Sequence, residues 1–383
     1  GEGFTSSMKV AFVHFHTFRL LRGIETLILS LANQLAAKGI EVSVLAARRT
    51  LERTLVDVDP RVRVKEFPTF RYFEHRTIAP LYFADIVRRK YDIVNIFFAD
   101  FGEAWALRAA SRFVDFRLNL YLCYPVDAAP DRFETFRSSR LSDRADVLIC
   151  DSNYVAEGAQ KFFGRPCVVI PVGTDVKKFK RDVGVREESR RRMGISSDDV
   201  VLLSVAALEK RKGIGRLVEA LPKVRSEYPS VRCVIVGSGT ERPMLEKRVA
   251  ELGLGDRVSF MGASTNLHSF YNAADIFVML PDYEANSIAS HEAMACELPL
   301  LVSASGGFGE VVDSSCGRLV PADDGDRIAS TLIELARDAP LRRELGAEAR
   351  RRIEERLTWD VISDQLIETF RSQLRNEAHS RPA

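Results

Sequence analysis

Short apolar runs alternate with segments of helical periodicity along most of this 383-residue chain, and this alternation constrains its fold more than any other feature. In the first half the expected strands are KVAFVHF, EVSVLAA, YDIVNIFF, LNLYLCY, ADVLIC and PCVVIPV, which begin at residues 9, 41, 91, 118, 145 and 166. In the second half VVLLSVAAL, VRCVIVG, RVSFMG, ADIFVML and LPLLVSA begin at residues 200, 231, 257, 274 and 298. Continuous apolar strands separated by helices predict parallel sheets that are covered on both faces.

The alternation is interrupted once, at residues 176–199, the least apolar long stretch, which we interpret as a linker. Because the chain is also too long for one ordinary core, we expect two doubly wound α/β domains, residues 8–180 and 181–357. Residues 358–383 are expected to form a helix whose apolar stripe packs on another part of the protein. Residues 1–7 lack the apolar core of a signal sequence, and we interpret them as a vector-derived remnant.

Composition excludes several classes of protein. The net charge of +2 argues against a dedicated nucleic-acid binder. Basic residues nevertheless outnumber acidic ones in residues 1–180 and are outnumbered in the remainder, which suggests different partners for the two halves. Six widely separated cysteines fit a reduced, cytoplasmic setting better than a disulfide framework or zinc site. No apolar run approaches the length of a membrane span.

The stretch EANSIASHEAMACELP, residues 284–299, places two glutamates directly after an expected strand. A helix that begins at Asn286 or Ser287 would present free N–H groups and the positive end of its dipole, which suits a diphosphate. Glu292 would accept from both hydroxyls of a ribose, while Glu284 would lie in the loop nearer the reacting sugar. A capped helix with two solvated glutamates explains the same pattern, since acidic residues favour helix starts in any case.

Residues 274–312, which contain this pair, resemble the E-x7-E signature region of family 4 glycosyltransferases, retaining enzymes of the GT-B fold. SVAALEKRKGIGRLVEALPKV, residues 204–224, resembles the family's strand, loop and helix that carry a phosphate-binding lysine, here Lys212. Residues 168–179 resemble its interdomain hinge, and residues 8–47 resemble its amino-terminal opening. The resemblance implies an α/β GT-B architecture. Two Rossmann-like domains would face each other across a cleft, and a C-terminal helix would cross back to the first domain.

The resemblance also assigns roles at the site. Glu284 and Lys212 would be the catalytic residues, with Lys212 offsetting charge on the departing phosphate. The residues that bind the donor, a nucleotide diphosphate sugar, would be Glu292, Asn286, Ser287, Ile288, Arg211, Gly23 and Gly237. No metal or other cofactor is expected. Asp57 and Asp59 have the spacing of a metal-binding DxD, but a polar turn explains them better.

The sequence departs from the family in its phosphate clamp, where Ala207 replaces the usual arginine and Arg211 or Lys210 would supply the charge. The amino-terminal glycine doublet is reduced to Gly23 preceded by arginine, and Glu297 stands where glycine is common.

On the acceptor side, many relatives have a histidine after the fifth strand, where this chain offers Tyr124 and Asp127. His14 and His16, which end the first strand, are further acceptor candidates, although ordinary structural hydrogen bonds explain them as well.

The segment Phe67–Lys90 mixes aromatic and basic residues and ends in Arg88, Arg89 and Lys90. This composition suits peripheral contact with an anionic membrane on its cytoplasmic face, but aromatic residues of a domain core would explain it equally.

Taken together, these features predict a retaining glycosyltransferase. It would act on a lipid-linked or glycan acceptor in cell-surface polysaccharide or glycolipid synthesis. A nucleotide-sugar epimerase of similar fold and a non-catalytic scaffold subunit are the alternatives.

Overall fold

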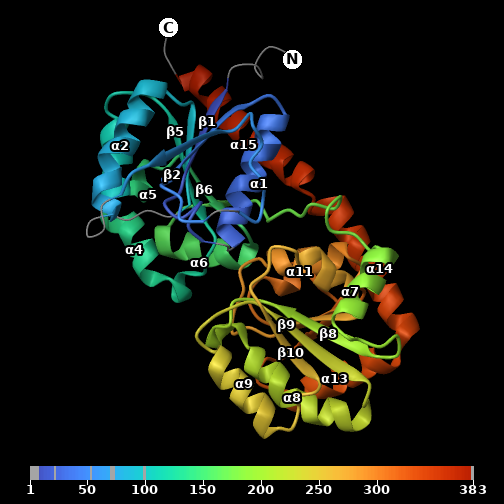
Figure 1. Ribbon diagram of the computed structural model, residues 1–383. Coiled ribbons are helices and arrows are strands. Elements are labelled where there is room, and N and C mark those ends of the chain that lie inside the picture. The colour runs from blue at the N-terminus through green and yellow to red at the C-terminus, as the bar shows by residue number, and fades with distance from the viewer. Residues whose placement is uncertain (1–7, 21–22, 52–53, 70–73, 98–100, 381–383) are drawn as a thin grey trace. The chain divides into compact units, whose positions relative to one another are not determined.

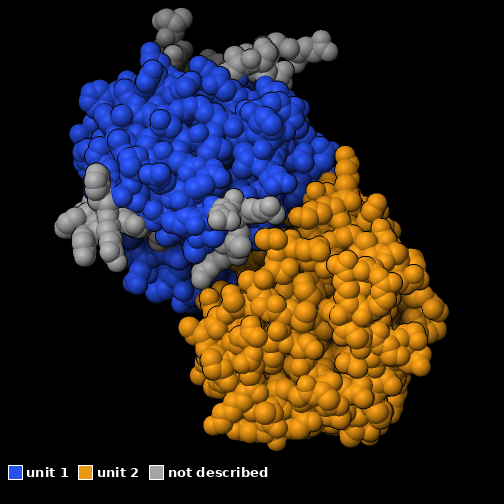
Figure 2. Space-filling model, viewed as in Figure 1, with its two compact units in different colours: residues 1–172, 359–383 blue, residues 173–358 orange. Residues whose placement is uncertain are grey.

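The computed structural model describes residues 8–20, 23–51, 54–69, 74–97 and 101–380, so the expected remnant at residues 1–7 lies outside the described residues. The chain divides into two compact units, which Figure 2 colours separately. Unit 1 contains residues 1–172 and 359–383, and unit 2 contains residues 173–358. The sequence predicts these two boundaries after residues 180 and 357.

Unit 1 is built on a seven-stranded sheet with the order β3-β2-β1-β4-β5-β6-β7 (Figure 1). Its strands are β1 (Lys9–Val13), β2 (Glu41–Ala47), β3 (Arg63–Phe67), β4 (Ile93–Ile96), β5 (Arg117–Leu122), β6 (Val147–Cys150) and β7 (Cys167–Val169). All neighbouring strands pair in parallel, with Val10 of β1 opposite Val42 on one side and Ile93 on the other. The central strands are almost wholly buried, as their apolar runs predict.

Helices pack on the sheet of unit 1. They are α1 (Gly23–Ala37), α2 (Glu74–Arg89), α3 (Phe101–Ala110), α4 (Pro130–Ser138), α5 (Leu141–Arg144), α6 (Asn153–Phe163) and α15 (Trp359–Ser380), with the short 3-10 turn η1 (Val126–Ala128).

The C-terminal helix α15 packs against unit 1 through its apolar stripe. Ile362, Leu366 and Phe370 are buried. Near the start of α15, Lys38, which directly follows α1, donates to Asp364 at 2.6 Å. Near its other end, the amide of Gln373 donates to Asn119 of β5 at 2.7 Å, inside the core.

Unit 2 contains a six-stranded parallel sheet with the order β10-β9-β8-β11-β12-β13. Its strands are β8 (Val200–Val205), β9 (Val231–Val236), β10 (Val258–Gly262), β11 (Ile276–Met279), β12 (Leu300–Ser303) and β13 (Gly317–Val320). Its helices are α7 (Val183–Arg192), α8 (Ile214–Glu227), α9 (Arg242–Glu251), α10 (Leu267–Ala273), α11 (Ile288–Ala295), α12 (Phe308–Val311), α13 (Gly325–Arg337) and α14 (Ala339–Arg356), with the 3-10 turn η2 (Lys210–Lys212). The parallel order agrees with the alternation in the sequence.

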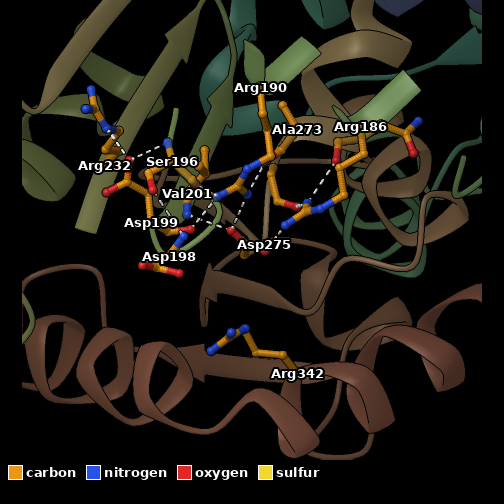
Figure 3. Close-up of polar contacts among 12 residues, drawn as sticks. Arg186, Arg190, Ser196, Asp198, Asp199, Val201, Arg232, Ala273, Asp275 and Arg342 are labelled. Carbon is orange, nitrogen blue, oxygen red and sulfur yellow. Dashed lines mark hydrogen bonds and ion pairs between the residues drawn. The ribbon is translucent and has the colours of Figure 1, made fainter. Parts of the chain in front are cut away.

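The interpretation of residues 176–199 as a linker is wrong, because α7 is an ordered part of unit 2 (Figure 3). Buried Arg190 donates to the carbonyl of Ala273 and to Asp275, each at 3.1 Å, and Arg186 donates to the other oxygen of Asp275 at 2.6 Å. Asp275 also accepts from the backbone N–H of Val201 at the start of β8. Guanidinium contacts, rather than an apolar stripe, hold this helix in place.

Candidate functional site in unit 2

The predicted catalytic residues Lys212 and Glu284 form an ion pair, although 72 residues separate them. Lys212 ends η2, and Glu284 lies in the loop that follows β11. Both side chains are largely buried, with exposed fractions of 13% and 15%. Two opposite charges are therefore held together at the carboxyl ends of β8 and β11, where ligands bind in parallel α/β sheets.

Gly213 allows the Lys212 turn to approach the end of β11. Its φ is +67°, and a Cβ placed there would lie 1.8 Å from the carbonyl oxygen of Leu280. Only glycine tolerates both the left-handed backbone and this close approach.

Arg211, proposed to replace the arginine missing at Ala207, lies in the same turn. Its guanidinium sits 5.5 Å from the ring centroid of Tyr283 and donates to Glu209 at 3.1 Å. The backbone carbonyl of Arg211 also accepts from the N–H of Asp282 at 2.8 Å. Arg211 is thus placed beside the loop that carries Glu284, although part of its charge is offset by Glu209.

The Glu284 loop is fixed by a glycine pair that sequence reasoning did not assign to the site. The N–H of Gly307 donates to the carbonyl of Glu284 at 2.8 Å. Gly306 has φ of +64°, and a Cβ on it would lie 2.0 Å from the same oxygen. The family resemblance included this segment, but no local pattern shows that it supports Glu284.

The residues from Glu284 to the start of α11 line a small pocket. Its walls are Glu284, Ala285, Asn286, Ser287, Ser290, His291, Gly307, Phe308, Val311 and Val312. Ser287 is the N-cap, because its hydroxyl accepts from the N–H of Ser290 at 3.2 Å. The helix begins at Ile288, so the predicted donor-binding segment of Asn286, Ser287 and Ile288 forms the helix start. Such a start favours anions through its free N–H groups and dipole.

Glu292 lies in the second turn of α11 and is almost entirely buried. Its Oε2 accepts a 2.8 Å hydrogen bond from the hydroxyl of Tyr271 on α10. Burial raises the pKa of Glu292 to about 7, while the Tyr271 hydrogen bond and the charge of Lys178 oppose this shift. The interpretation of Glu292 as a solvated helix residue is therefore wrong.

Gly237, the last predicted donor-binding residue of unit 2, directly follows β9. Its φ is +142°, and a Cβ placed there would lie 1.8 Å from the carbonyl oxygen of Ala206, which follows β8. The glycine lets the ends of these two neighbouring strands approach each other closely.

In unit 1 the acceptor candidates lie at the carboxyl ends of β1 and β5. His14 is buried, and burial together with the charges of His16 and Arg132 lowers its pKa to about 3, so that it is neutral. The guanidinium of Arg132 lies 4.4 Å from the ring centroid of Tyr124. Arg132, which the sequence did not suggest, thus lies near both His14 and Tyr124.

The remaining two predicted residues of unit 1 lie close to these strand ends in sequence. Asp127 is exposed in η1, and Gly23 is the first residue of α1.

The described residues contain no cluster of three or more His, Cys, Asp or Glu side chains suited to a metal ion. Asp59 of the DxD-like turn pairs with Arg61 at 2.7 Å. Across the helices that the structure describes, none has the length and hydropathy needed to cross a bilayer.

Two family models match the chain. One, described as "Glycosyl transferases group 1", matches residues 185–352, and the other, described as "Glycosyltransferase Family 4", matches residues 21–178.

The chain also resembles curated proteins of this class. It is 29% identical to a GDP-mannose-dependent monoacylated alpha-(1-6)-phosphatidylinositol monomannoside mannosyltransferase of Corynebacterium glutamicum, over 62% of this chain and 65% of the relative. The match therefore spans slightly less than two thirds of that relative. A D-inositol 3-phosphate glycosyltransferase of Corynebacterium urealyticum is also 29% identical, over 95% of this chain and 96% of the relative.

Solved structures share the fold. Sucrose-phosphate synthase from Thermosynechococcus elongatus superposes with a TM-score of 0.83 at 22% identity, covering 96% of this chain and all of that one. HepE of Anabaena, solved with UDP and glucose, gives a TM-score of 0.81 at 20% identity, covering 95% of this chain and all of that one. These matches confirm the predicted GT-B architecture of two parallel-sheet α/β units with a C-terminal helical region.

Proposed function

The chain belongs to glycosyltransferase family 4, and from this premise we propose that it transfers a sugar from a nucleoside diphosphate sugar to a lipid-linked or glycan acceptor. The observation that carries the proposal is the Lys212–Glu284 ion pair beside the start of α11. We further propose that the transfer retains the anomeric configuration and needs no metal.

In this proposal the diphosphate binds where the start of α11 and Lys212 offer positive charge. Free N–H groups at the helix start would bind phosphate oxygens, and Lys212 would offset the charge that grows as the nucleoside diphosphate leaves. Because charge increases during the reaction, the contribution of Lys212 would be larger in the transition state than in the ground state.

Glu284 and Glu292 would recognise different parts of the donor. Glu292, which lies deeper, would accept from the ribose hydroxyls, and Glu284 would contact the transferred sugar. Similar proteins support both UDP and GDP donors. HepE was solved with UDP-glucose, and the mannosyltransferases use GDP-mannose.

The names of relatives support two kinds of acceptor. A phosphatidylinositol mannoside is a membrane glycolipid, whereas D-inositol 3-phosphate is a small phosphorylated polyol. In unit 1, Arg132 would provide positive charge for a phosphate-bearing acceptor near His14, His16 and Tyr124. We propose a lipid-linked or glycan acceptor as the substrate class.

The structure changes the surface that we assign to peripheral membrane contact. Part of the segment Phe67–Lys90 lies outside the described residues, and two of its described aromatics, Phe67 and Tyr82, are buried in the core. Its exposed basic residues are Arg88, Arg89 and Lys90 at the end of α2. The aromatic residues that face solvent come instead from α3 and the turn after it.

An aromatic–basic surface forms where α2 packs on α3. Trp105 and Phe113, with exposed fractions of 59% and 68%, both contact the ring of Phe83, at centroid distances of 6.4 and 5.6 Å. The exposed charged residues around them in 77–90 and 102–115 are Arg88, Arg89, Lys90, Arg108, Arg112 and Asp115. Five of these six are basic, so the surface suits an anionic bilayer into whose interface the rings insert. We call it the α2–α3 surface.

The α2–α3 surface would tether unit 1 to the membrane rather than bind the reacting hydroxyl. The turns that follow α2 and α3 meet at the amino ends of β4 and β5, where the N–H of Arg117 donates to the carbonyl of Asp92 at 2.8 Å. His14 and Tyr124 follow the carboxyl ends of their strands.

The proposed function is tested first with the donor. UDP-, GDP- and ADP-sugars are screened for thermal stabilisation of the full chain, since a bound ligand raises apparent stability. The best donor is then incubated with lipid-linked and soluble acceptors. Acceptor-dependent release of the nucleoside diphosphate with an α-linked product from an α-linked donor supports retaining transfer. An epimerase would interconvert sugars without an acceptor, and a scaffold subunit would release no nucleoside diphosphate.

A further inference from the structure

None of the roles proposed above for the site residues involves the hydrogen bond between Tyr271 and Glu292. Tyr271 is fully buried on α10, and its hydroxyl donates to Oε2 of Glu292 at 2.8 Å. A carboxylate offers two oxygens, so this bond leaves Oε1 to accept from a ligand. Without the tyrosine hydroxyl, the buried carboxyl would be free to rotate and would be less well stabilised in its charged form.

The ring of Tyr271 is itself held on two sides. Phe179 meets it edge-on at a centroid distance of 5.7 Å and an interplanar angle of 83°, and Phe277 of β11 lies 6.2 Å away. The end of α10 is held by the arginine contacts of Figure 3, in which Arg190 binds the carbonyl of Ala273. These contacts keep the hydroxyl at a defined position against α11.

Residues 179–182 of unit 2 bind to the same helix. The side-chain amide of Asn272 donates to the carbonyl of Lys180 at 3.0 Å and accepts from the N–H of Asp182 at 2.7 Å. Arg350 of α14 donates to the carbonyl of Phe179, and also to that of Ala295 on α11, each at 2.7 Å. Residues 179–182 and α11 are thus tied together around Tyr271.

We propose that Tyr271 is a positioning residue for nucleotide binding: its hydroxyl fixes Oε2 of Glu292 so that Oε1 is presented to the ribose of the donor. The inference rests on the proposed function, because it assumes that Glu292 binds a ribose. It adds a residue 21 positions away that touches Glu292 and not the donor.

The proposal has a pH signature. Several titratable or charged groups act on this region: Tyr271 from α10, Lys178 from the loop before α7, Arg350 from α14 and Cys296, the C-cap of α11. The Tyr271 hydrogen bond favours the charged form of Glu292 and so lowers its pKa, as Lys178 does. Ribose hydroxyls also favour the carboxylate, so affinity should fall as the pH drops through about 7. Removing the hydroxyl should move this fall to higher pH.

The experiment measures affinity of the full chain for UDP, GDP and ADP by calorimetry between pH 5.5 and 9. We expect Tyr271→Phe to weaken binding of the nucleotide with the highest affinity roughly tenfold at pH 7, because about one hydrogen bond to a charged group is lost. The pH midpoint at which affinity falls should be higher for this variant than for the wild type. The difference in affinity between the two proteins should shrink at pH 9. Glu292→Gln should remove the midpoint.

Tyr91→Phe is the matched control, because buried Tyr91 donates to Asp85 at 2.8 Å in unit 1 and has no role in the donor site. It should leave nucleotide affinity and its pH profile unchanged. If Glu292→Ala weakens binding while Tyr271→Phe keeps the wild-type affinity and midpoint, the positioning role is wrong and the ribose assignment stands. If no nucleotide binds the wild type, or if Glu292→Ala binds as well as it does, the proposed function of this site fails, and the inference fails with it.

Discussion

The ammonium of Lys212 and the carboxylate of Glu284 are paired across two loops, one after β8 and one after β11. Gly213 allows the turn that carries Lys212 to approach the end of β11, from which the Glu284 loop continues. The pair holds the lysine beside the loop that leads to the start of α11. A departing phosphate would then compete with Glu284 for the lysine, which makes the two side chains energetically coupled.

Lys212→Ala should lower kcat about 100-fold while changing affinity for the donor sugar nucleotide only a few-fold. The reason is that a positive charge beside the departing phosphate acts mainly in the transition state, where negative charge develops. Steady-state kinetics and direct nucleotide binding separate the two effects. Exposed Lys247 on α9 provides the matched control, and Lys247→Ala should keep near-wild-type turnover. Equal losses in kcat and in affinity for Lys212→Ala would indicate simple ground-state binding instead.

Glu284→Gln keeps the shape of the side chain and removes its charge. We expect it to reduce transfer strongly and to leave nucleoside diphosphate affinity unchanged, since Glu284 is assigned to the sugar and not to the nucleotide. Combining it with Lys212→Ala in a double-mutant cycle should give effects that are far from additive, because the two side chains are in contact. A Glu284→Gln variant with full activity would remove this residue from the site.

The buried carboxyl of Glu292 should make stability depend on pH. Its pKa is raised from 4.5 to about 7, so between these values the folded state binds more protons than the unfolded state, and stability falls as pH rises through this window. The shift corresponds to a loss of about 3 kcal/mol, as an order of magnitude. Urea unfolding of the wild type and Glu292→Gln across pH 4.5–8 should show profiles that diverge. Parallel profiles would mean that folding does not raise the pKa of Glu292.

Much of the fold followed from the strand alternation, but elements whose stability comes from polar contacts did not. The strand pattern of β3 is weak and β13 was not expected, since both are edge strands with charged residues. Helix α7 was interpreted as a linker because its anchors are Arg186 and Arg190, which no apolar periodicity reveals.

At the site, the family resemblance predicted which residues take part, and the structure gives the contacts that hold them in place. Lys212, Glu284 and Glu292 were named from motifs. The support of Glu292 by Tyr271 and of Glu284 by Gly307 depends on chain segments that meet only in the folded unit.

Glu297 has a left-handed backbone, with φ of +59°, a conformation that favours glycine. It follows the C-cap of α11, the position at which many helices end on glycine. Glu297→Gly should therefore stabilise the chain by about 1 kcal/mol, because it relieves the steric cost of this conformation. Chemical denaturation measures the change, and Glu297→Ala, which keeps a Cβ, is the control that should gain little. A loss of stability in the glycine variant would show that the glutamate side chain makes a compensating contribution.

The α2–α3 surface predicts reversible binding of the full chain to anionic vesicles. Each exposed basic residue near such a surface contributes about 1 kcal/mol, so Arg88→Gln, Arg89→Gln and Lys90→Gln together should weaken co-sedimentation roughly 100-fold. Trp105→Ser with Phe113→Ser should weaken it at every ionic strength, whereas the contribution of the basic residues should disappear in high salt. Met244→Ser and Lys247→Gln, which change an exposed apolar and an exposed basic residue of unit 2, are matched controls that should bind as the wild type does. If binding is insensitive to lipid charge and to both sets of α2–α3 variants, and transfer to a soluble acceptor is efficient, this surface has no membrane role. Concentration-dependent self-association that Trp105→Ser abolishes would identify it instead as a contact between copies of the chain.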